Sequence, residues 1–168
     1  MAETLDPALP NGMLTSAGRL LKRASEQDLM LATAESCTGG LLATLLTDMP
    51  GRSHVFDRGF VVYSTAAKCD LLNIERSKVD DCGPVSREVA VAMAEGALAR
   101  SAAHIALAIT GFAGPGEPGD EEGLVHFACA RAGYLTRHRE EHFGAIGRSG
   151  VRIAAVTVAL EMLEEVLG

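Results

Sequence analysis

The sequence predicts a three-layer α/β/α sandwich built on a mixed, mostly parallel β-sheet. Short apolar runs typical of buried strands alternate with segments of helical periodicity, and two strand-like runs near the carboxyl end flank a glycine turn typical of a hairpin. The chain has 168 residues, 48% of them hydrophobic, which is enough to bury a core without disulfides or a structural metal. We therefore expect a single domain over residues 13–168, preceded by a flexible leader over residues 1–12 that is rich in turn-forming residues.

The first half of this domain alternates helices with strands. Apolar residues recur with helical spacing in the helices and follow one another almost without a break in the first strand. The expected elements are a helix over residues 13–27, a strand over 29–34, a helix over 41–49, a strand over 56–63 and a short helix over 64–72. Pro50 and Gly51 end the second helix, and Ser64 is the expected N-cap of the third.

The second half is expected to begin with a polar loop that ends at Pro84. The remaining elements are a helix over residues 89–97, a buried strand over 105–110, a glycine and proline loop over 111–119, hairpin strands over 124–131 and 135–143, and a helix over 148–167. The last helix carries two apolar stripes. A second stripe favours a homo-oligomer, although a helix that is buried on both sides within its own domain gives the same pattern.

The charge balance disfavours nucleic-acid binding. Fifteen Lys and Arg against 22 Asp and Glu give a formal charge of −7, and two Tyr, five Phe and no Trp leave few rings to stack on bases. No segment reaches the roughly 20 apolar residues of a membrane helix, and the amino end lacks the pattern of a signal peptide. We therefore expect no membrane partner and a cytoplasmic location. The four cysteines lack Cys-x-x-Cys spacing, which suits reduced thiols.

Polar residues follow the first predicted strand, at the sheet edge where α/β proteins bind ligands. Ser36, Cys37 and Thr38 lie on a strand-to-helix turn. The backbone N–H groups of Thr38, Gly39 and Gly40 are placed there to bind an oxyanion or a phosphate. The alternative is that Ser and Thr only cap the helix and that the two glycines only permit the turn.

Tyr63 and Lys68 follow the second predicted strand. A lysine in the first turns of a helix opposes the helix dipole, and its pKa falls if it is also desolvated. Because serine needs a neighbouring base to react at neutral pH, Ser36 with Tyr63 and Lys68 would make an activated nucleophile. The alternative is an exposed lysine and a half-buried tyrosine without a catalytic role.

The loop after the third strand matches a dinucleotide-binding pattern that we reject. Gly114, Gly116 and Gly119 have the spacing Gly-x-Gly-x-x-Gly. That fingerprint must open a helix, whereas this loop contains two prolines and leads into three acidic residues that would repel a pyrophosphate. We expect it to form the backbone wall of a polar pocket.

Residues 138–142 match the metal-binding pattern His-x-x-Glu-His, which requires a helix. The surrounding residues predict a strand instead, with His138, Glu140 and His142 on one face. We therefore expect no metal here, and we expect the isolated His126 to be a structural or surface histidine.

Several segments taken together resemble the CinA carboxy-terminal domain family from about Leu14 to the end. They are Ala-Glu-Ser-Cys-Thr-Gly-Gly at 34–40, Gly-Phe-Val-Val-Tyr-Ser at 59–64 with Lys68, Val-Ser at 85–86, and Ile-Thr-Gly-Phe-Ala-Gly-Pro at 109–115. The enzymes of this family are nicotinamide-nucleotide amidases of pyridine-nucleotide recycling. The resemblance therefore implies a hydrolase that converts nicotinamide mononucleotide to nicotinate mononucleotide and ammonia without a cofactor. Some relatives carry an additional amino-terminal domain, which a chain of this length lacks, so it resembles the stand-alone form.

The resemblance also implies roles for single residues. Ser36 would attack the carboxamide carbon and form an acyl-enzyme ester, with Lys68 as the base and Tyr63 assisting proton transfer. Backbone N–H groups near 38–40 or at 111–114 would stabilise the oxyanion, and a cationic residue would bind the phosphate. The candidate substrate-binding residues are Glu35, Thr38, Gly39, Gly40, Thr110, Gly111, Gly114 and Arg148.

Two departures from the family pattern keep other functions open. The family's Gly-Asp-Arg appears here as Gly-Ala-Ile-Gly-Arg at 144–148, and its Gly-Thr-Val appears as Gly-Leu-Val at 123–125. A second hypothesis is therefore a catalytically silent module that binds a nucleotide or a partner. A third is a metalloenzyme that uses His138 and His142 and loses activity with chelators.

Overall fold

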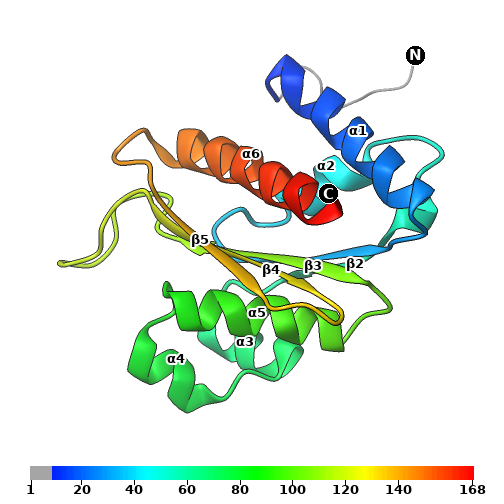
Figure 1. Cartoon of the computed structure of the whole chain (residues 1–168). Coiled ribbons are helices and arrows are strands. Elements are labelled where there is room, and N and C mark those ends of the chain that lie inside the picture. Colours follow the sequence, from blue (N-terminus) through cyan, green and yellow to red (C-terminus); the bar gives the residue numbers. More distant parts are fainter. Residues whose placement is uncertain (1–8) are drawn as a thin grey trace.

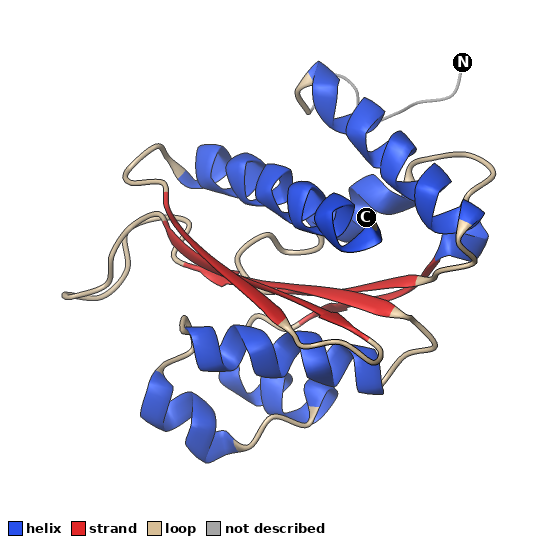
Figure 2. Ribbon diagram, viewed as in Figure 1, coloured by secondary structure: helices blue, strands red, loops and turns tan. Residues whose placement is uncertain are grey.

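The computed structural model of this chain describes residues 9–168. They form a three-layer α/β/α sandwich in which one five-stranded sheet lies between two layers of helices (Figures 1 and 2). This arrangement confirms the predicted fold class. Residues 1–8 of the expected leader lie outside the described part. The rest of the leader was assigned wrongly, because Leu9 is buried in the core and the first helix already begins at Asn11.

The elements of the first half follow the predicted order. They are α1 (Asn11–Glu26), β1 (Leu31–Glu35), α2 (Leu41–Thr47), a short 3₁₀ turn η1 (Ser53–Val55), β2 (Phe56–Val61) and α3 (Thr65–Leu72). Ser64 caps α3 as predicted, because its hydroxyl accepts a hydrogen bond from the Ala67 N–H at 3.0 Å. This cap fixes the first turn of α3 and therefore the position of Lys68.

The second half contains one helix that the sequence pattern does not predict. Its elements are α4 (Arg76–Cys82), α5 (Arg87–Ala99), β3 (Ile105–Gly111), β4 (Leu124–Arg131), β5 (Arg137–His142) and α6 (Arg148–Leu167). The segment expected to be a polar loop holds α4, which buries only Val79 and so shows no apolar period. Packing of α4 against α3 and α5 supports this short helix instead.

The strand order is β2-β1-β3-β4-β5. β1 pairs in parallel with both β2 and β3, whereas β4 is antiparallel to β3 and to β5. The predicted hairpin is therefore the antiparallel extension of a parallel core. Because β1, β2 and β3 run in one direction, the segments that follow them meet at the same edge of the sheet.

The two faces of the sheet are packed differently, as β3 shows. Its Ile105, Leu107 and Ile109 side chains pack in a core with α1, α2 and α6, whereas Ala106 and Ala108 pack in a second core with α5. Small side chains on that face let α5 approach the sheet closely. A similar close approach occurs at Gly96 of α5, where an added Cβ would collide with the Leu72 carbonyl oxygen of α3.

Helix α6 is packed against β3 and β4 and also contacts α1 and α2. Members of both predicted apolar stripes are buried within the chain, among them Val151 and Ala155 of the first stripe and Val156, Leu160 and Leu163 of the second. The second stripe is therefore explained without another subunit. The homo-oligomer stays a prediction, but this helix no longer supports it.

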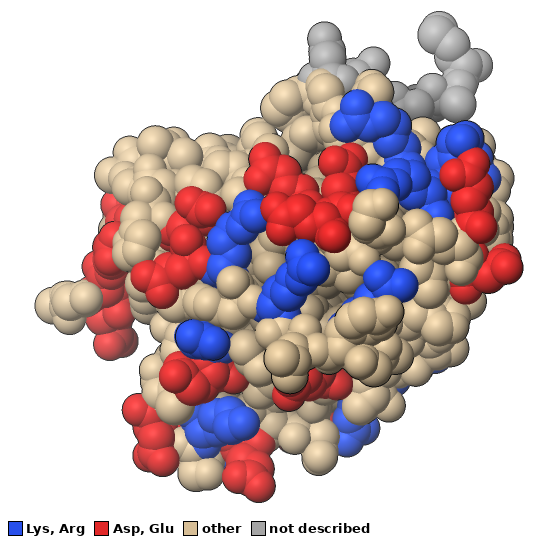
Figure 3. Space-filling view, viewed as in Figure 1, with Lys and Arg blue, Asp and Glu red and all other residues tan. Residues whose placement is uncertain are grey.

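The surface carries both signs of charge. On the face shown in Figure 3, acidic and basic side chains are intermingled. Around β5 and α6 they form ion pairs, including Arg139 with Glu161 at 3.1 Å and with Glu165 at 2.6 Å. None of the helices within residues 9–168 is long and apolar enough to cross a membrane.

Candidate active site

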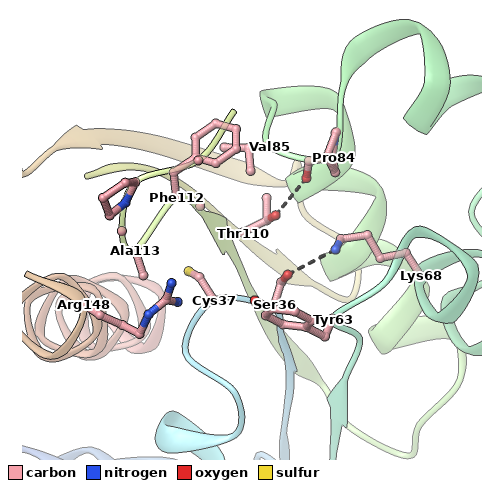
Figure 4. Close-up of a pocket in the computed structure, with 14 residues that line it drawn as sticks. Ser36, Cys37, Tyr63, Lys68, Pro84, Val85, Thr110, Phe112, Ala113 and Arg148 are labelled. Carbon is pink, nitrogen blue, oxygen red and sulfur yellow. Dashed lines mark hydrogen bonds between the residues drawn. The ribbon is translucent and has the colours of Figure 1, made fainter. Parts of the chain in front are cut away.

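A cavity of about 280 Å³ lies where the segments after β1, β2 and β3 meet (Figure 4). Side chains from the segments after β1 and β2, from α3, β3 and α6, and from a glycine-rich loop surround it. Its lining comprises Ser36, Cys37, Tyr63, Lys68, Pro84, Val85, Thr110, Gly111, Phe112, Ala113, Gly114, Pro115, Gly116 and Arg148. The structure therefore brings together Ser36, Tyr63, Lys68, Thr110, Gly111, Gly114 and Arg148 of the predicted site.

Ser36 and Lys68 are in direct contact at this cavity. Lys68 Nζ lies 3.1 Å from Ser36 Oγ (Figure 4). It also donates a hydrogen bond to the Val62 carbonyl oxygen at 3.0 Å. The Ser36 backbone is held by its own N–H, which donates to the Ile109 carbonyl oxygen of β3 at 3.0 Å. Two neighbouring strands thus position the serine, and the residue after β2 orients the lysine amine.

The environment of Lys68 favours its neutral amine. The residue is only 1% exposed, and in the described part of the chain no carboxylate forms an ion pair with it. Burial lowers the pKa of Lys68 from its ordinary value of 10.5. Because the Val62 carbonyl can only accept, one N–H of the amine points to it, and a neutral amine also has a lone pair that is able to accept the Ser36 hydroxyl proton. Lys68 is therefore placed as a base for Ser36.

Cys37 lies beside Ser36 in the cavity but is a poor nucleophile there. Its thiol is 8% exposed, and burial raises its pKa to about 11. The thiolate is the reactive form of cysteine, so at neutral pH this group is almost entirely unreactive. The buried amine of Lys68 hydrogen-bonds to Ser36, and no hydrogen bond between Lys68 and the Cys37 thiol is present.

Tyr63 lines the mouth of the cavity and is 72% exposed. Among the described residues, no hydrogen bond joins its hydroxyl to Ser36 or Lys68. In this arrangement Tyr63 forms part of the cavity wall beside Ser36 (Figure 4). Its predicted part in proton transfer has no contact in the structure to support it.

Glu35, Thr38, Gly39 and Gly40 are not among the residues that line this cavity, so their part in substrate binding stays a prediction. The buried Glu35 carboxylate accepts hydrogen bonds from the Thr38 hydroxyl at 2.6 Å and from the N–H groups of Leu42 and Ala43 at 3.1 and 2.8 Å. A carboxylate of the protein itself thus occupies the amino end of α2, where we had expected a substrate anion. This segment shapes the turn that presents Ser36.

The glycine-rich loop forms the opposite wall. The Thr110 hydroxyl donates to the Pro84 carbonyl oxygen at 2.8 Å, which ties the end of β3 to the segment before α5 (Figure 4). Phe112 N–H donates to Leu124, whereas the N–H groups of Ala113 and Gly114 have no acceptor among the described residues. No helix follows this loop within residues 112–123, which agrees with rejecting the dinucleotide fingerprint.

Arg148 is the first residue of α6, and its guanidinium points into the cavity over Gly114 (Figure 4). No acidic side chain in the described part of the chain pairs with it. The N-cap position before it is Gly147, so no side chain caps the amino end of α6. A cation and an uncapped helix end therefore border the cavity together.

Sequence reasoning missed one arginine and several wall residues. Arg152, one helical turn after Arg148, donates to the Thr38 carbonyl oxygen at 2.8 Å and so holds the turn after Ser36. The i, i+4 spacing of the two arginines was the available signal. Pro84, Val85 and Phe112 also line the cavity. Val85 and Phe112 belong to segments that carry the family resemblance, but their apolar side chains gave no chemical reason to assign them a role.

A buried lysine in contact with a serine, in a cavity at the carboxyl edge of a mixed sheet, defines an α/β protein with a serine–lysine pair. The chain belongs to the CinA C-terminal domain family, whose sequence pattern matches residues 14–167. This confirms the resemblance recognised in the sequence.

Named relatives agree with this assignment. A CinA-like protein of Akkermansia muciniphila is 46% identical over 132 residues, which are 74% of this chain and 32% of the relative. A CinA-like protein of Syntrophotalea carbinolica is 39% identical over 160 residues, which are 94% of this chain and 38% of the relative. The chain thus spans about a third of the length of these relatives.

Solved structures match over the whole chain. The competence/damage inducible protein CihA from Agrobacterium tumefaciens has a TM-score of 0.93 and 42% identity, with 100% of both chains covered. A CinA superfamily protein from Escherichia coli has a TM-score of 0.87 and 32% identity, covering 98% of this chain and 99% of that one. The five-stranded mixed sheet with its two helical layers is therefore the fold of this family.

Proposed function

We propose that the protein is a nicotinamide-nucleotide amidase, which hydrolyses nicotinamide mononucleotide to nicotinate mononucleotide and ammonia. The observation that carries the proposal is the 3.1 Å contact between Lys68 Nζ and Ser36 Oγ in the cavity. That pair supports acyl transfer as the reaction class. The choice of a nucleotide amide as substrate is supported by membership of the family, which includes such amidases.

In the first half of the reaction, Ser36 Oγ attacks the carboxamide carbon of the substrate. Its proton passes to the neutral amine of Lys68, and a tetrahedral intermediate forms. When the C–N bond breaks, the Lys68 ammonium returns the proton to the leaving nitrogen. Ammonia departs, and the nicotinoyl group stays on Ser36 as an ester.

In the second half, water takes the place of ammonia. Lys68 accepts a proton from the water as it attacks the ester carbon, and the proton then returns to Ser36 Oγ as the ester bond breaks. Nicotinate mononucleotide leaves and the enzyme is regenerated. A depressed pKa suits Lys68 to both halves, because the same group must accept and donate a proton near neutral pH.

Two other parts of the cavity suit the charges of this reaction. The N–H groups of Ala113 and Gly114 are candidates for the oxyanion donors, and loss of one such donor typically costs about 2.7–4 kcal/mol. Arg148 and the uncapped end of α6 are candidates for the phosphate. Leu124, where the sequence departs from the family pattern, is not among the residues that line the cavity.

The test is to incubate the purified protein with nicotinamide mononucleotide and to measure both ammonia and nicotinate mononucleotide, with and without EDTA. We expect release by the wild type that is insensitive to EDTA and absent in Ser36→Ala. Substrate binding by folded protein without turnover would favour the catalytically silent binding module instead. Release that EDTA abolishes would favour the metalloenzyme.

A further inference from the structure

Two histidines and a glutamate gather on the sheet face that α5 covers, away from the lining of the active-site cavity. His126 comes from β4, and His138 and Glu140 come from β5. In the antiparallel register His126 lies opposite Glu140 and Ala128 lies opposite His138, so the three side chains share one face. None of them lines the cavity that holds Ser36.

The ligand atoms of these side chains have the spacing of a metal site. His126 Nδ1 lies 3.0 Å from His138 Nε2 and 3.6 Å from a carboxylate oxygen of Glu140, and all three atoms lie within 4.8 Å of one another. Ligands held about 2.0–2.1 Å from a tetrahedral Zn²⁺ are separated by about 3.3–3.4 Å. The two measured separations bracket this value. Glu140 is exposed, so its side chain is able to move and adjust the third separation, between its carboxylate oxygen and the ligand nitrogen of His138.

The groups around the cluster also suit a metal. Burial lowers the pKa of both His126 and His138, which favours the neutral imidazole that binds metals. The other oxygen of Glu140 is 2.8 Å from His142 Nε2, and His142 Nδ1 is 2.6 Å from Glu121. Such outer contacts are the usual means by which a ligating carboxylate is oriented.

We propose that His126, His138 and Glu140 bind one divalent transition metal ion of the Zn²⁺ type. Three protein ligands would leave the fourth tetrahedral position to water. The proposal revises our expectation of no metal, because the His-x-x-Glu-His pattern pairs His138 with His142, whereas the structure pairs it with His126. It is independent of the amidase proposal, since no step of that reaction uses these residues.

A site of this kind would link β4 to β5. Thr110 of β3 is paired with His126 of β4, so the metal would lie one strand away from the wall of the cavity. The ion would therefore stabilise the antiparallel half of the sheet, and the serine and lysine would keep their contact without it.

The experiment is a titration of EDTA-treated, dialysed protein with Zn²⁺ by calorimetry, and with Co²⁺ by visible absorption. We expect one equivalent to bind the wild type, and we expect His138→Gln and Glu140→Gln to weaken Zn²⁺ binding at least 100-fold. His142→Gln should weaken it roughly 10–100-fold through loss of the outer contact. His54→Gln is the matched control, because His54 contacts Ser25 at another part of the surface, and its binding should equal that of the wild type.

Circular dichroism shows whether each variant is folded. Zn²⁺ should raise the melting temperature of the wild type and of His54→Gln but not of Glu140→Gln. Absence of a one-equivalent site in the wild type would overturn the proposal. So would equal Zn²⁺ affinity in the wild type and in folded His138→Gln.

Discussion

Replacing Lys68 by methionine separates a catalytic lysine from a structural one. Methionine keeps most of the side-chain volume and removes only the amine that contacts Ser36 and the Val62 carbonyl. A general base contributes about 10²–10⁴-fold to a rate, which corresponds to about 2.7–5.4 kcal/mol of activation free energy. We therefore expect the kcat of amide hydrolysis to fall by that factor.

The same change should alter the free energy of unfolding much less. Loss of the amine leaves the Ser36 hydroxyl and the Val62 carbonyl without a buried partner, at a cost of about 1 kcal/mol each. Removal of a desolvated amine that has no carboxylate partner offsets this cost. The net change should stay within about 2 kcal/mol, well below the loss in activation free energy at the upper end of its range.

The pH dependence of stability gives an independent check. The pKa of Lys68 is lower in the folded protein than its ordinary value of 10.5, so between the two values the unfolded chain binds more protons. The wild type should therefore become more stable as pH rises through this window, and Lys68→Met should lack that gain.

The assays are initial rates of ammonia release and urea denaturation at several pH values, with Lys78→Met, a change at an exposed lysine of α4, as the control. Retention of more than a tenth of the wild-type kcat by Lys68→Met would refute the assignment of Lys68 as the base. Equal pH dependence of stability in the wild type and Lys68→Met would refute its depressed pKa.

Three further predictions concern the phosphate, the serine turn and helix packing. Arg148→Gln should raise KM for the nucleotide more than it lowers kcat, because the guanidinium faces the cavity without an acidic partner in the described chain. An unchanged KM in steady-state kinetics would count against phosphate binding by Arg148. Glu35→Gln should lower the free energy of unfolding by about 1.5–3 kcal/mol in urea denaturation, since the carboxylate accepts three hydrogen bonds. A variant as stable as the wild type would show that these bonds make no net contribution to stability. Gly96→Ala should lower the free energy of unfolding by about 1–3 kcal/mol, because the new methyl group collides with Leu72. Gly12→Ala is the control, since open space surrounds Gly12 and its stability should not fall. Equal melting temperatures for the two variants would contradict the close packing of α3 and α5.

The fold was predictable because its signals are local. Buried strands such as β3 read as apolar runs, and the positions of turns follow from Gly and Pro. The boundaries differ where a tertiary contact overrides the local pattern. β1 extends to Glu35, a charged residue, because α2 supplies N–H donors to its carboxylate. α4 escaped prediction because it buries a single residue.

The candidate site was predictable in its chemistry and less so in its geometry. Ser36 and Lys68 were chosen by residue type and position after strands, and Arg148 followed from the family resemblance; the structure brings all three to one cavity. The oxyanion and phosphate donors proposed at Thr38, Gly39 and Gly40 depended on which group fills a helix end, and only the three-dimensional structure shows that Glu35 does so. The pairing of His126 with His138 likewise depends on strand register, which the sequence does not specify.

We assign Ser36, and not the neighbouring Cys37, as the nucleophile of the proposed amidase. The most direct measurement is the initial rate of ammonia release from nicotinamide mononucleotide by Ser36→Ala and Cys37→Ala, compared side by side in EDTA. We expect a loss of at least about 10³-fold for Ser36→Ala, as for other serine nucleophiles. Cys37→Ala should keep a rate within several-fold of the wild type, because burial raises the pKa of the Cys37 thiol to about 11. Loss of activity in Cys37→Ala with retention in Ser36→Ala would contradict this assignment.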